Sequence, residues 1–215
     1  MADERSLLAR GPWDPDRLEV SWRGDAFQPD AAAAAAADDA LQELRDRGSP
    51  SHDGLAAGLV AWESDGDRLR LELQPVRWSL RLLPENAVGI SCSCMVRAAD
   101  GRWLAGRRAA WLASWAGRWA LGAAGAVEVD ENPAATMHRE LQEEWSVQAE
   151  RLQLEALVRL PSGSVLLIGQ AWLAEGATVT PDDEHDEYAW WPPDVAAWPP
   201  EAHAPLRIMA GLASA

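Results

Sequence analysis

One stretch of the sequence, Gly125 to Val147, gathers acidic residues at spacings that could do chemistry together. It reads GAVEVDENPAATMHRELQEEWSV, and its second half holds Glu140, Glu143 and Glu144. At about 100° per residue of an α-helix, these three carboxylates share an arc of roughly 100°. Hard divalent cations such as Mg²⁺ prefer oxygen ligands, and a bound cation would offset the repulsion between like charges one turn apart. The spacing therefore predicts a site for a divalent metal.

The residues around the acids predict the helix that carries them. Asn132 is a favourable N-cap and Pro133 suits the first turn, so we expect a helix over about 133–145. Its apolar residues fall on the arc beside the acidic one, and they are Ala134, Met137, Leu141 and Trp145. A solvated acidic helix face without function is the alternative interpretation. The added Glu131, Gly125 and strand–loop–helix setting favour a functional site.

The same stretch resembles the Nudix signature: Gly, five residues, Glu, seven residues, Arg-Glu-aliphatic, one residue, Glu-Glu, one residue, Gly-aliphatic. All but one of its fixed positions are matched, by Gly125, Glu131, Arg139, Glu140, Leu141, Glu143, Glu144 and Val147. The departure is Ser146, where the family has Gly. If that position needs a positive φ, Ser costs on the order of 1 kcal/mol relative to Gly.

The resemblance implies a hydrolase that uses Mg²⁺ or Mn²⁺ to cleave a diphosphate linkage. It implies that Arg139 pairs with a carboxylate of the signature and holds its rotamer. The implied metal ligands are Glu140, Glu143 and Glu144, a backbone carbonyl near Gly125, and Glu131, which could instead support the loop. The expected fold is α/β, a Nudix-type α/β/α sandwich with a mixed sheet.

Other candidate site residues lie outside this stretch. The acidic segment before a late strand resembles the one in many Nudix enzymes, and it offers Glu187 as a catalytic base and Glu184 near the substrate. Arg97 and Arg107 are candidate phosphate ligands, as are Arg108 and Arg118. Trp111 or Trp115 could stack on a base or sugar, although most of the tryptophans should be buried. We expect His138 to be packed and His185 to be exposed.

The composition excludes several classes of partner. The formal net charge is −15 and every cation is Arg, so nucleic acid and anionic membranes are disfavoured as partners. No apolar stretch approaches the roughly 20 residues that span a bilayer. The N-terminus lacks the pattern of a signal peptide, and Cys92 and Cys94 should be buried free thiols, so we expect a cytoplasmic protein.

The chain divides into a candidate extension, residues 1–85, and a Nudix domain, residues 86–215. The extension is predicted to be α+β, with an irregular arm first, a helix from Asp30 to Arg47 and short strands at Leu18–Trp22, Leu59–Trp62 and Leu69–Leu73. Val76–Leu83 should be extended, and in the second part Ala126–Val129 should be a strand. We expect the extension to pack on the Nudix domain, to border the substrate cleft and to take part in a possible homodimer.

The substrate class is narrowed but not fixed by the sequence. A nucleoside diphosphate linked to a sugar or similar group, including ADP-ribose, is the first expectation. Removal of damaged nucleoside triphosphates is the alternative. A Nudix-fold binding or regulatory module without activity is a third possibility, but such modules usually lose the acids that this chain keeps.

Overall fold

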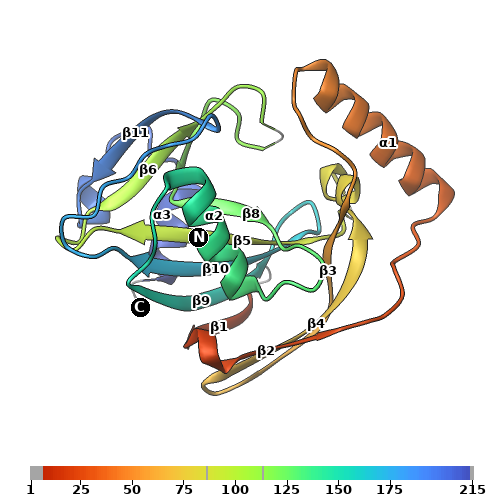
Figure 1. The fold of residues 1–215 in the computed structure, drawn as a ribbon, viewed down its shortest axis with the longest axis horizontal. Helices are drawn as coiled ribbons and strands as arrows, with labels where there is room; N and C mark the ends of the chain where they lie inside the picture. Colours follow the sequence, from red (N-terminus) through yellow and green to blue (C-terminus); the bar gives the residue numbers. More distant parts are fainter. Residues whose placement is uncertain (1–6, 86, 113, 214–215) are drawn as a thin grey trace.

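The main sheet of the molecule is mixed and has eight strands. The structure is a computed structural model, which describes residues 7–85, 87–112 and 114–213 (Figure 1). The strands follow the order β1-β9-β10-β5-β6-β11, with β7 paired to β6 and β8 paired to β5. β5 and β10 run parallel, whereas β9 and β10 run antiparallel. The strands are β1 (Leu7–Trp13), β5 (Ile90–Arg97), β6 (Trp103–Arg108), β7 (Trp119–Leu121), β8 (Ala123–Ala126), β9 (Arg151–Arg159), β10 (Val165–Trp172) and β11 (His185–Trp191).

Two helices cover opposite faces of this sheet. Successive strand residues face opposite sides, so Cys94 of β5 belongs to the buried cluster under α2 (Pro133–Trp145), whereas Met95 belongs to the cluster under α3 (Ala204–Leu212). Figure 1 shows α2 in front of the sheet and α3 behind it. The predicted α/β/α sandwich is confirmed.

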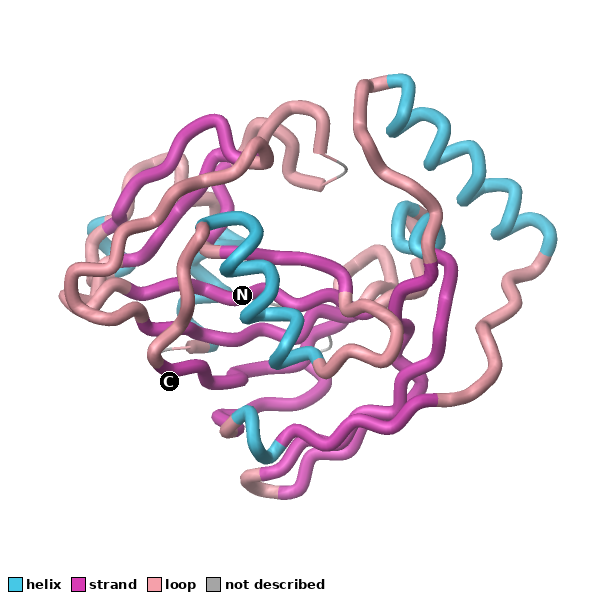
Figure 2. Tube along the Cα trace, in the orientation of Figure 1, coloured by secondary structure: helices cyan, strands magenta, loops and turns pink. Residues whose placement is uncertain are grey.

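A second sheet of three strands, in the order β2-β4-β3, comes from the N-terminal part of the chain. Its strands are β2 (Leu18–Trp22), β3 (Leu55–Asp65) and β4 (Arg68–Arg77), and β3 and β4 form the long hairpin at the right and lower edge in Figure 2. Leu69, Leu71 and Leu73 of β4 are buried in the same cluster as Met137 of α2. The extension and the Nudix-like part therefore share one hydrophobic core.

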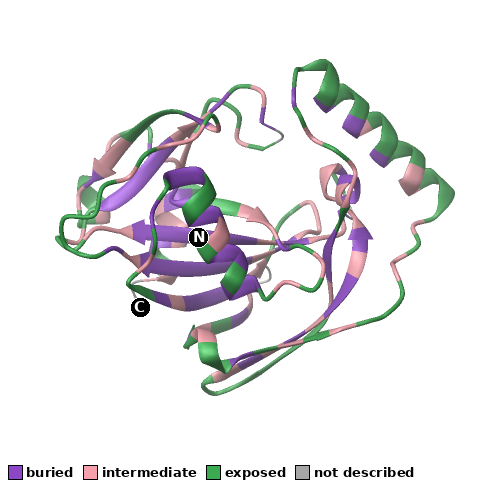
Figure 3. Cartoon of the chain, in the orientation of Figure 1, coloured by how far each residue is buried: buried purple, intermediate pink, exposed green. Residues whose placement is uncertain are grey.

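The helix α1 (Ala31–Asp46) packs on the short 3₁₀ helix η3 (Trp78–Leu82). Asp30 caps α1 as predicted, since its carboxylate accepts the N–H of Ala33 at 2.8 Å. Most of α1 is exposed in Figure 3, and its buried side chains are Ala37, Leu41 and Leu44. None of the described helices is both long and apolar enough to cross a membrane.

Three expected elements differ in the structure. The arm at Leu7–Trp13 is a strand, β1, at the edge of the main sheet, where Pro12 is tolerated because an edge strand leaves one row of backbone groups unpaired. Trp78–Leu82 is a 3₁₀ helix, with the N–H of Ser79 bonded to Asp53, and of the expected segment Val76 and Arg77 belong to a strand, β4. The strand expected at 126–129 is β8, three residues earlier, because its register is set by pairing with β5.

Candidate active site

The helix that carries the acids is α2, with the predicted bounds. The Asn132 side chain caps it by accepting the N–H of Ala134 at 2.8 Å, and Pro133 opens it. Met137, Leu141 and Trp145 are fully buried against the sheet. This packing fixes the rotation of α2 about its axis and so turns the adjoining acidic arc toward β8.

The helix ends at Ser146, which adopts a left-handed conformation with φ 52° and ψ 37°. Its N–H donates to the carbonyl of Gln142 at 3.1 Å. The position that is Gly in the signature therefore does require a positive φ here, and Ser accepts that backbone strain without loss of an acidic side chain.

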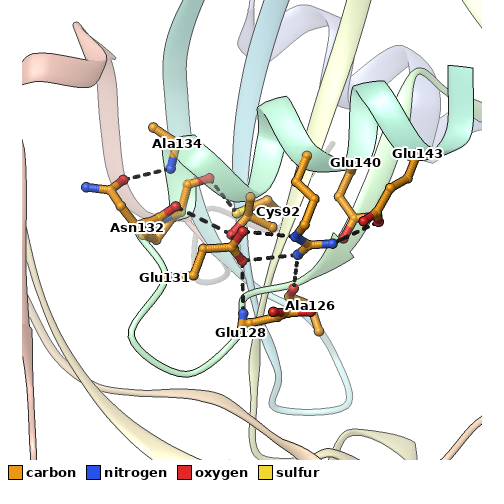
Figure 4. Close-up of polar contacts among 11 residues, drawn as sticks. Cys92, Ala126, Glu128, Glu131, Asn132, Ala134, Glu140 and Glu143 are labelled. Atoms are coloured by element: carbon orange, nitrogen blue, oxygen red, sulfur yellow. Dashed lines mark hydrogen bonds and ion pairs between the residues drawn. The ribbon is translucent and has the colours of Figure 1, made fainter. Parts of the chain in front are cut away.

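Arg139 is the centre of a polar network whose partners Ala126, Glu131, Glu140 and Glu143 are labelled in Figure 4. Its Nε and Nη2 atoms donate to the two carboxylate oxygens of Glu131 at 2.9 and 3.0 Å. Its Nη1 atom donates to Glu140 at 2.6 Å and to Glu143 at 3.1 Å. Nη2 also donates to the carbonyl of Ala126 at 3.1 Å. One guanidinium thus links α2, the preceding loop and β8.

Glu131 has its carboxylate oxygens fully engaged in this network. In addition to the bonds from Arg139, the carboxylate of Glu131 accepts a hydrogen bond from the Thr136 hydroxyl at 2.7 Å and one from the Glu128 N–H at 3.1 Å. Burial opposes its ionisation, but the hydrogen bonds from Arg139 and Thr136 outweigh burial and hold the pKa of Glu131 below its usual value. Of the two roles expected for Glu131, metal ligand and support of the loop, these hydrogen bonds favour support of the loop.

Glu140 packs directly against the backbone of Gly125. A Cβ atom added at Gly125 would lie 1.8 Å from Glu140 Oε1, so any side chain there would displace the carboxylate. Glu140 is buried, and this burial raises its pKa to about 7, with further upward contributions from the charges of Glu143 and Glu184. Gly125 is therefore required for close approach of β8 to an acid of α2.

Glu144 is the most deeply buried acid of the group. One oxygen accepts the N–H of Ala124 at 2.9 Å, while the other, Oε2, is buried and has no hydrogen-bond partner among the described residues. Burial raises the pKa of Glu144 well above its usual value. The Nε2 atom of His185 lies 3.7 Å from Oε2 and is likewise without a hydrogen-bond partner there.

His185 is buried, which corrects the expectation of an exposed side chain. Its ring lies 4.4 Å from that of Trp145, and burial lowers its pKa, so neutral imidazole is favoured beside Glu144. His138 was expected to be packed, but it is exposed. It follows Met137, which faces the sheet, and the next residue of a helix points about 100° away from that direction.

The residues present suit a divalent cation by the chemistry of their donors. Glu144 Oε2 is a buried oxygen that no described group satisfies, and Glu140 and Glu143 are carboxylates one turn or less away. In the described part of the chain, however, no three acidic, cysteine or histidine side chains already surround a common point. Arg139 holds Glu140 and Glu143, so a cation at Glu144 requires these two carboxylates to rotate toward it.

Glu184 lies just before β11 and Glu187 lies within it, and each forms an ion pair with an arginine of β6. Glu184 lies 3.5 Å from Arg108, and its charge acts on both Glu140 and Glu144. The structure therefore brings it near the acids of the Nudix signature on α2, Glu140, Glu143 and Glu144, which we call the box acids. Glu187 is exposed and lies 3.4 Å from Arg107 on the adjacent strand β6. Burial also raises the pKa of Glu184.

The other candidate substrate residues lie in different surroundings. Arg97 stacks on the ring of Trp103 at 3.9 Å and donates to the carbonyl of Gly101, so it is held in the β5–β6 hairpin. Trp115 packs beside His203, with ring centroids 6.1 Å apart. Trp111 is half-buried and Arg118 is exposed. The thiols of Cys92 and Cys94 are free and buried, as expected.

The comparison with protein families gives a match to the NUDIX domain over residues 88–210, more than half of the chain. The chain belongs to the Nudix family. Its membership and the retained acids make it a hydrolase of the pyrophosphatase type. Among curated proteins, none matches the chain.

Solved structures of Nudix proteins are similar to the chain at low sequence identity. The MutT Nudix hydrolase from Burkholderia pseudomallei is 23% identical, with a TM-score of 0.49, over 59% of this chain and 98% of that one. The Nudix domain of Shewanella oneidensis NrtR, solved with ADP ribose, is 21% identical, with a TM-score of 0.45, over 57% and 85%. A C. elegans Ap4A hydrolase is 16% identical, with a TM-score of 0.45, over 59% and 96%.

Sequence reasoning about this Nudix protein missed some contributors to the site. Ala124 acts through its backbone N–H, which no side-chain pattern reveals. The hydroxyl of Thr136, in the first turn of α2, donates to Glu131. The position of a threonine in the first turn after an acidic loop residue was the signal in the sequence. Arg81 of η3 lies far away in sequence but within electrostatic range of Glu140.

Proposed function

We propose that this Nudix protein is a Mg²⁺-dependent pyrophosphohydrolase whose substrate is a nucleoside diphosphate joined to another group, such as an NDP-sugar or ADP-ribose. The observation that carries the proposal is the buried oxygen of Glu144 that has no hydrogen-bond partner among the described residues, on the same helix as Glu140 and Glu143, whose carboxylates Arg139 holds in place. A network of this kind orients metal ligands, as outer hydrogen bonds do in other metal sites. Mn²⁺ should substitute for Mg²⁺.

Each residue then has a separable part in the reaction. Glu144, Glu140 and Glu143 would hold the cation, together with the backbone near Gly125. When bound, the cation neutralises diphosphate oxygens and lowers the pKa of a water molecule. Glu131 would act through Arg139, by keeping the guanidinium in the orientation that positions Glu140.

Proton transfer from the attacking water needs a base near the box acids. Glu184 fits this role better than Glu187, because its charge acts on Glu140 and Glu144 whereas Glu187 is exposed and paired with Arg107. Burial raises the pKa of Glu184 toward the working range of a base at neutral pH. Attack on phosphorus then breaks one P–O bond of the diphosphate and releases two phosphorylated products.

The proposed substrate class, a single diphosphate, is argued from the positive charge available around the acids. A substrate with many phosphates requires many cations, and the described cations that act most strongly on Glu140 and Glu184 are Arg139, Arg108 and Arg81. Two of them already pair with carboxylates. A single diphosphate suits this supply better than a highly phosphorylated compound.

A substrate screen tests the proposal. The purified protein should be incubated with NDP-sugars, ADP-ribose, dinucleoside polyphosphates and canonical or oxidised nucleoside triphosphates, each with Mg²⁺, Mn²⁺ or EDTA. We expect hydrolysis of an NDP-linked compound that stops in EDTA and returns with Mg²⁺. Preference for triphosphates would replace the substrate class, and full activity in EDTA would overturn the metal assignment.

A further inference from the structure

Arg81, on η3 of the N-terminal extension, lies at the edge of the box-acid site. It lines a small cleft together with Trp78, Ser91 of β5 and Ala126 of β8. The carbonyl of Ala126 is the one that accepts a hydrogen bond from Arg139. The cleft therefore joins the extension to the polar network of α2.

The backbone around Arg81 is fixed against the start of β5. The N–H of Val88 donates to the carbonyl of Leu80 at 3.3 Å. Gly89 has φ 151°, a conformation that side chains disfavour, and a Cβ added there would lie 3.6 Å from the Cβ of Arg81. The Ser79 N–H is bonded to Asp53 at 3.0 Å on the other side. These contacts hold the backbone of Arg81 in a fixed position.

The guanidinium of Arg81 has no anionic partner of its own. Within the described ranges, it forms no hydrogen bond or ion pair, and its side-chain neighbour is the Trp78 ring, 5.4 Å from Cζ. Arg108, by comparison, pairs with Glu184. Loss of hydration lowers the pKa of Arg81, while the charges of Glu140 and Glu184 act in the opposite direction. A partly dehydrated cation without a bonded anion is costly, and an anion that enters the site would relieve this cost.

We propose that Arg81 is a substrate-positioning residue, which binds phosphate oxygens of the diphosphate held at the box acids, so that the N-terminal extension completes the active site. The inference rests on the proposed function, because it assumes that a diphosphate occupies this site. A guanidinium suits the task because its parallel N–H groups bind two phosphate oxygens at once. The extension then contributes to substrate affinity and not only to the core.

The test uses the full-length protein and three variants. Arg81→Gln removes the charge, Arg81→Lys keeps it without the planar fork, and Arg68→Gln is the matched control, since Arg68 pairs with Glu19 on the outer sheet of the same extension. KM and kcat are measured on the best substrate of the screen. The Kd for α,β-methylene-ADP is measured by calorimetry with saturating Mn²⁺, and Mn²⁺ affinity is measured separately without the nucleotide.

We expect Arg81→Gln to raise KM and this Kd by roughly tenfold to a hundredfold, the range for loss of a charged hydrogen bond. Arg81→Lys should recover part of the loss, whereas kcat, Mn²⁺ affinity and the Arg68→Gln control should stay near the wild-type values. An unchanged KM and Kd in an active enzyme would overturn the inference and leave the proposed function intact.

Two further outcomes separate the inference from the proposed function. If the wild-type protein cleaves no compound in the screen, the proposed function fails, and the Kd comparison alone decides whether Arg81 binds phosphate. If Arg81→Gln weakens Mn²⁺ binding but leaves the Kd for α,β-methylene-ADP unchanged, Arg81 balances the charge of the box acids, and the inference is wrong.

Discussion

Arg139 and Glu131 form a two-bond ion pair that joins α2 to the loop before it, with donor–acceptor distances of 2.9 and 3.0 Å. The two parallel bonds restrict the rotation of the guanidinium plane. The remaining N–H groups can then reach Glu140 and Glu143 on the same helix and Ala126 on β8. The pair between Arg139 and Glu131 therefore helps to hold the carboxylates of Glu140 and Glu143 in place.

The first prediction concerns Glu131→Gln. The amide keeps one acceptor but places an NH₂ group against an N–H of Arg139, so the plane of the guanidinium is no longer fixed. We expect kcat to fall about 10- to 100-fold, the range for loss of an outer partner of a metal site, and unfolding in urea to show a stability loss of about 1–3 kcal/mol. The control is Glu128→Gln, an exposed acid whose backbone alone joins the network. Equal activity in both variants would contradict the positioning role.

The second prediction concerns Glu144→Gln. Glu144 is proposed as a metal ligand, so kcat of this variant should fall at least about 100-fold. Because burial raises its pKa in the folded protein, the ionised carboxylate destabilises the apo form at neutral pH and above. In EDTA at about pH 8 the variant should therefore be more stable than wild type, by at least about 1 kcal/mol.

This stability gain should disappear near pH 4, where the wild-type carboxyl is protonated in both the folded and the unfolded states. Glu150→Gln, which alters an exposed acid beyond the end of α2, is the matched control and should change neither property. Near-normal turnover of Glu144→Gln would show that another acid holds the metal.

The third prediction concerns Ser146→Gly at the C-cap of α2. The position has φ 52°, where a side chain costs more than glycine. The free energy of unfolding should rise by about 1 kcal/mol, measured as a higher urea midpoint with an unchanged m-value, and kcat should stay the same. Ser146→Ala keeps the strain and should give no gain. A stabilised alanine variant would place the effect in the hydroxyl group instead.

The fourth prediction is a pH dependence that arises outside the site. Glu155 of β9 is buried, and burial raises its pKa to about 7 from 4.5 in spite of the nearby Arg10 and Arg151. As pH rises from about 5 to 7, the unfolded chain loses this proton before the folded chain does, so stability decreases.

Glu155→Gln cannot ionise, so its stability relative to wild type should increase by on the order of 2–3 kcal/mol between pH 4.5 and pH 8. Urea unfolding of both proteins at about pH 4.5, 6 and 8 in EDTA measures the difference, in which the contributions of Glu140 and Glu144 cancel. A constant difference over this range would show that Glu155 ionises normally.

The local features of the Nudix box could be predicted from the sequence by itself. The start of α2 at Pro133 and its buried side chains depend on contacts within a few residues, and helical periodicity describes those contacts well. The cap of α1 at Asp30 follows for the same reason. The positive φ at Ser146 was only a conditional expectation, which the structure decided. The spacing of the acids predicts a metal site, whereas their individual roles are implied by the resemblance to the Nudix signature and remain predictions.

Only the tertiary structure decided which distant segments meet. Leu7–Trp13 carries a proline and reads as irregular, yet pairing with β9 makes it a strand, because the partner supplies the hydrogen bonds. The burial of His185 and the unsatisfied oxygen of Glu144 depend on how β11 packs against α2. Arg81 approaches Glu140 because β3, β4 and η3 fold back onto the start of β5. Periodicity along one segment determines which faces are apolar, but the burial and charge of a site depend on segments that the fold brings together.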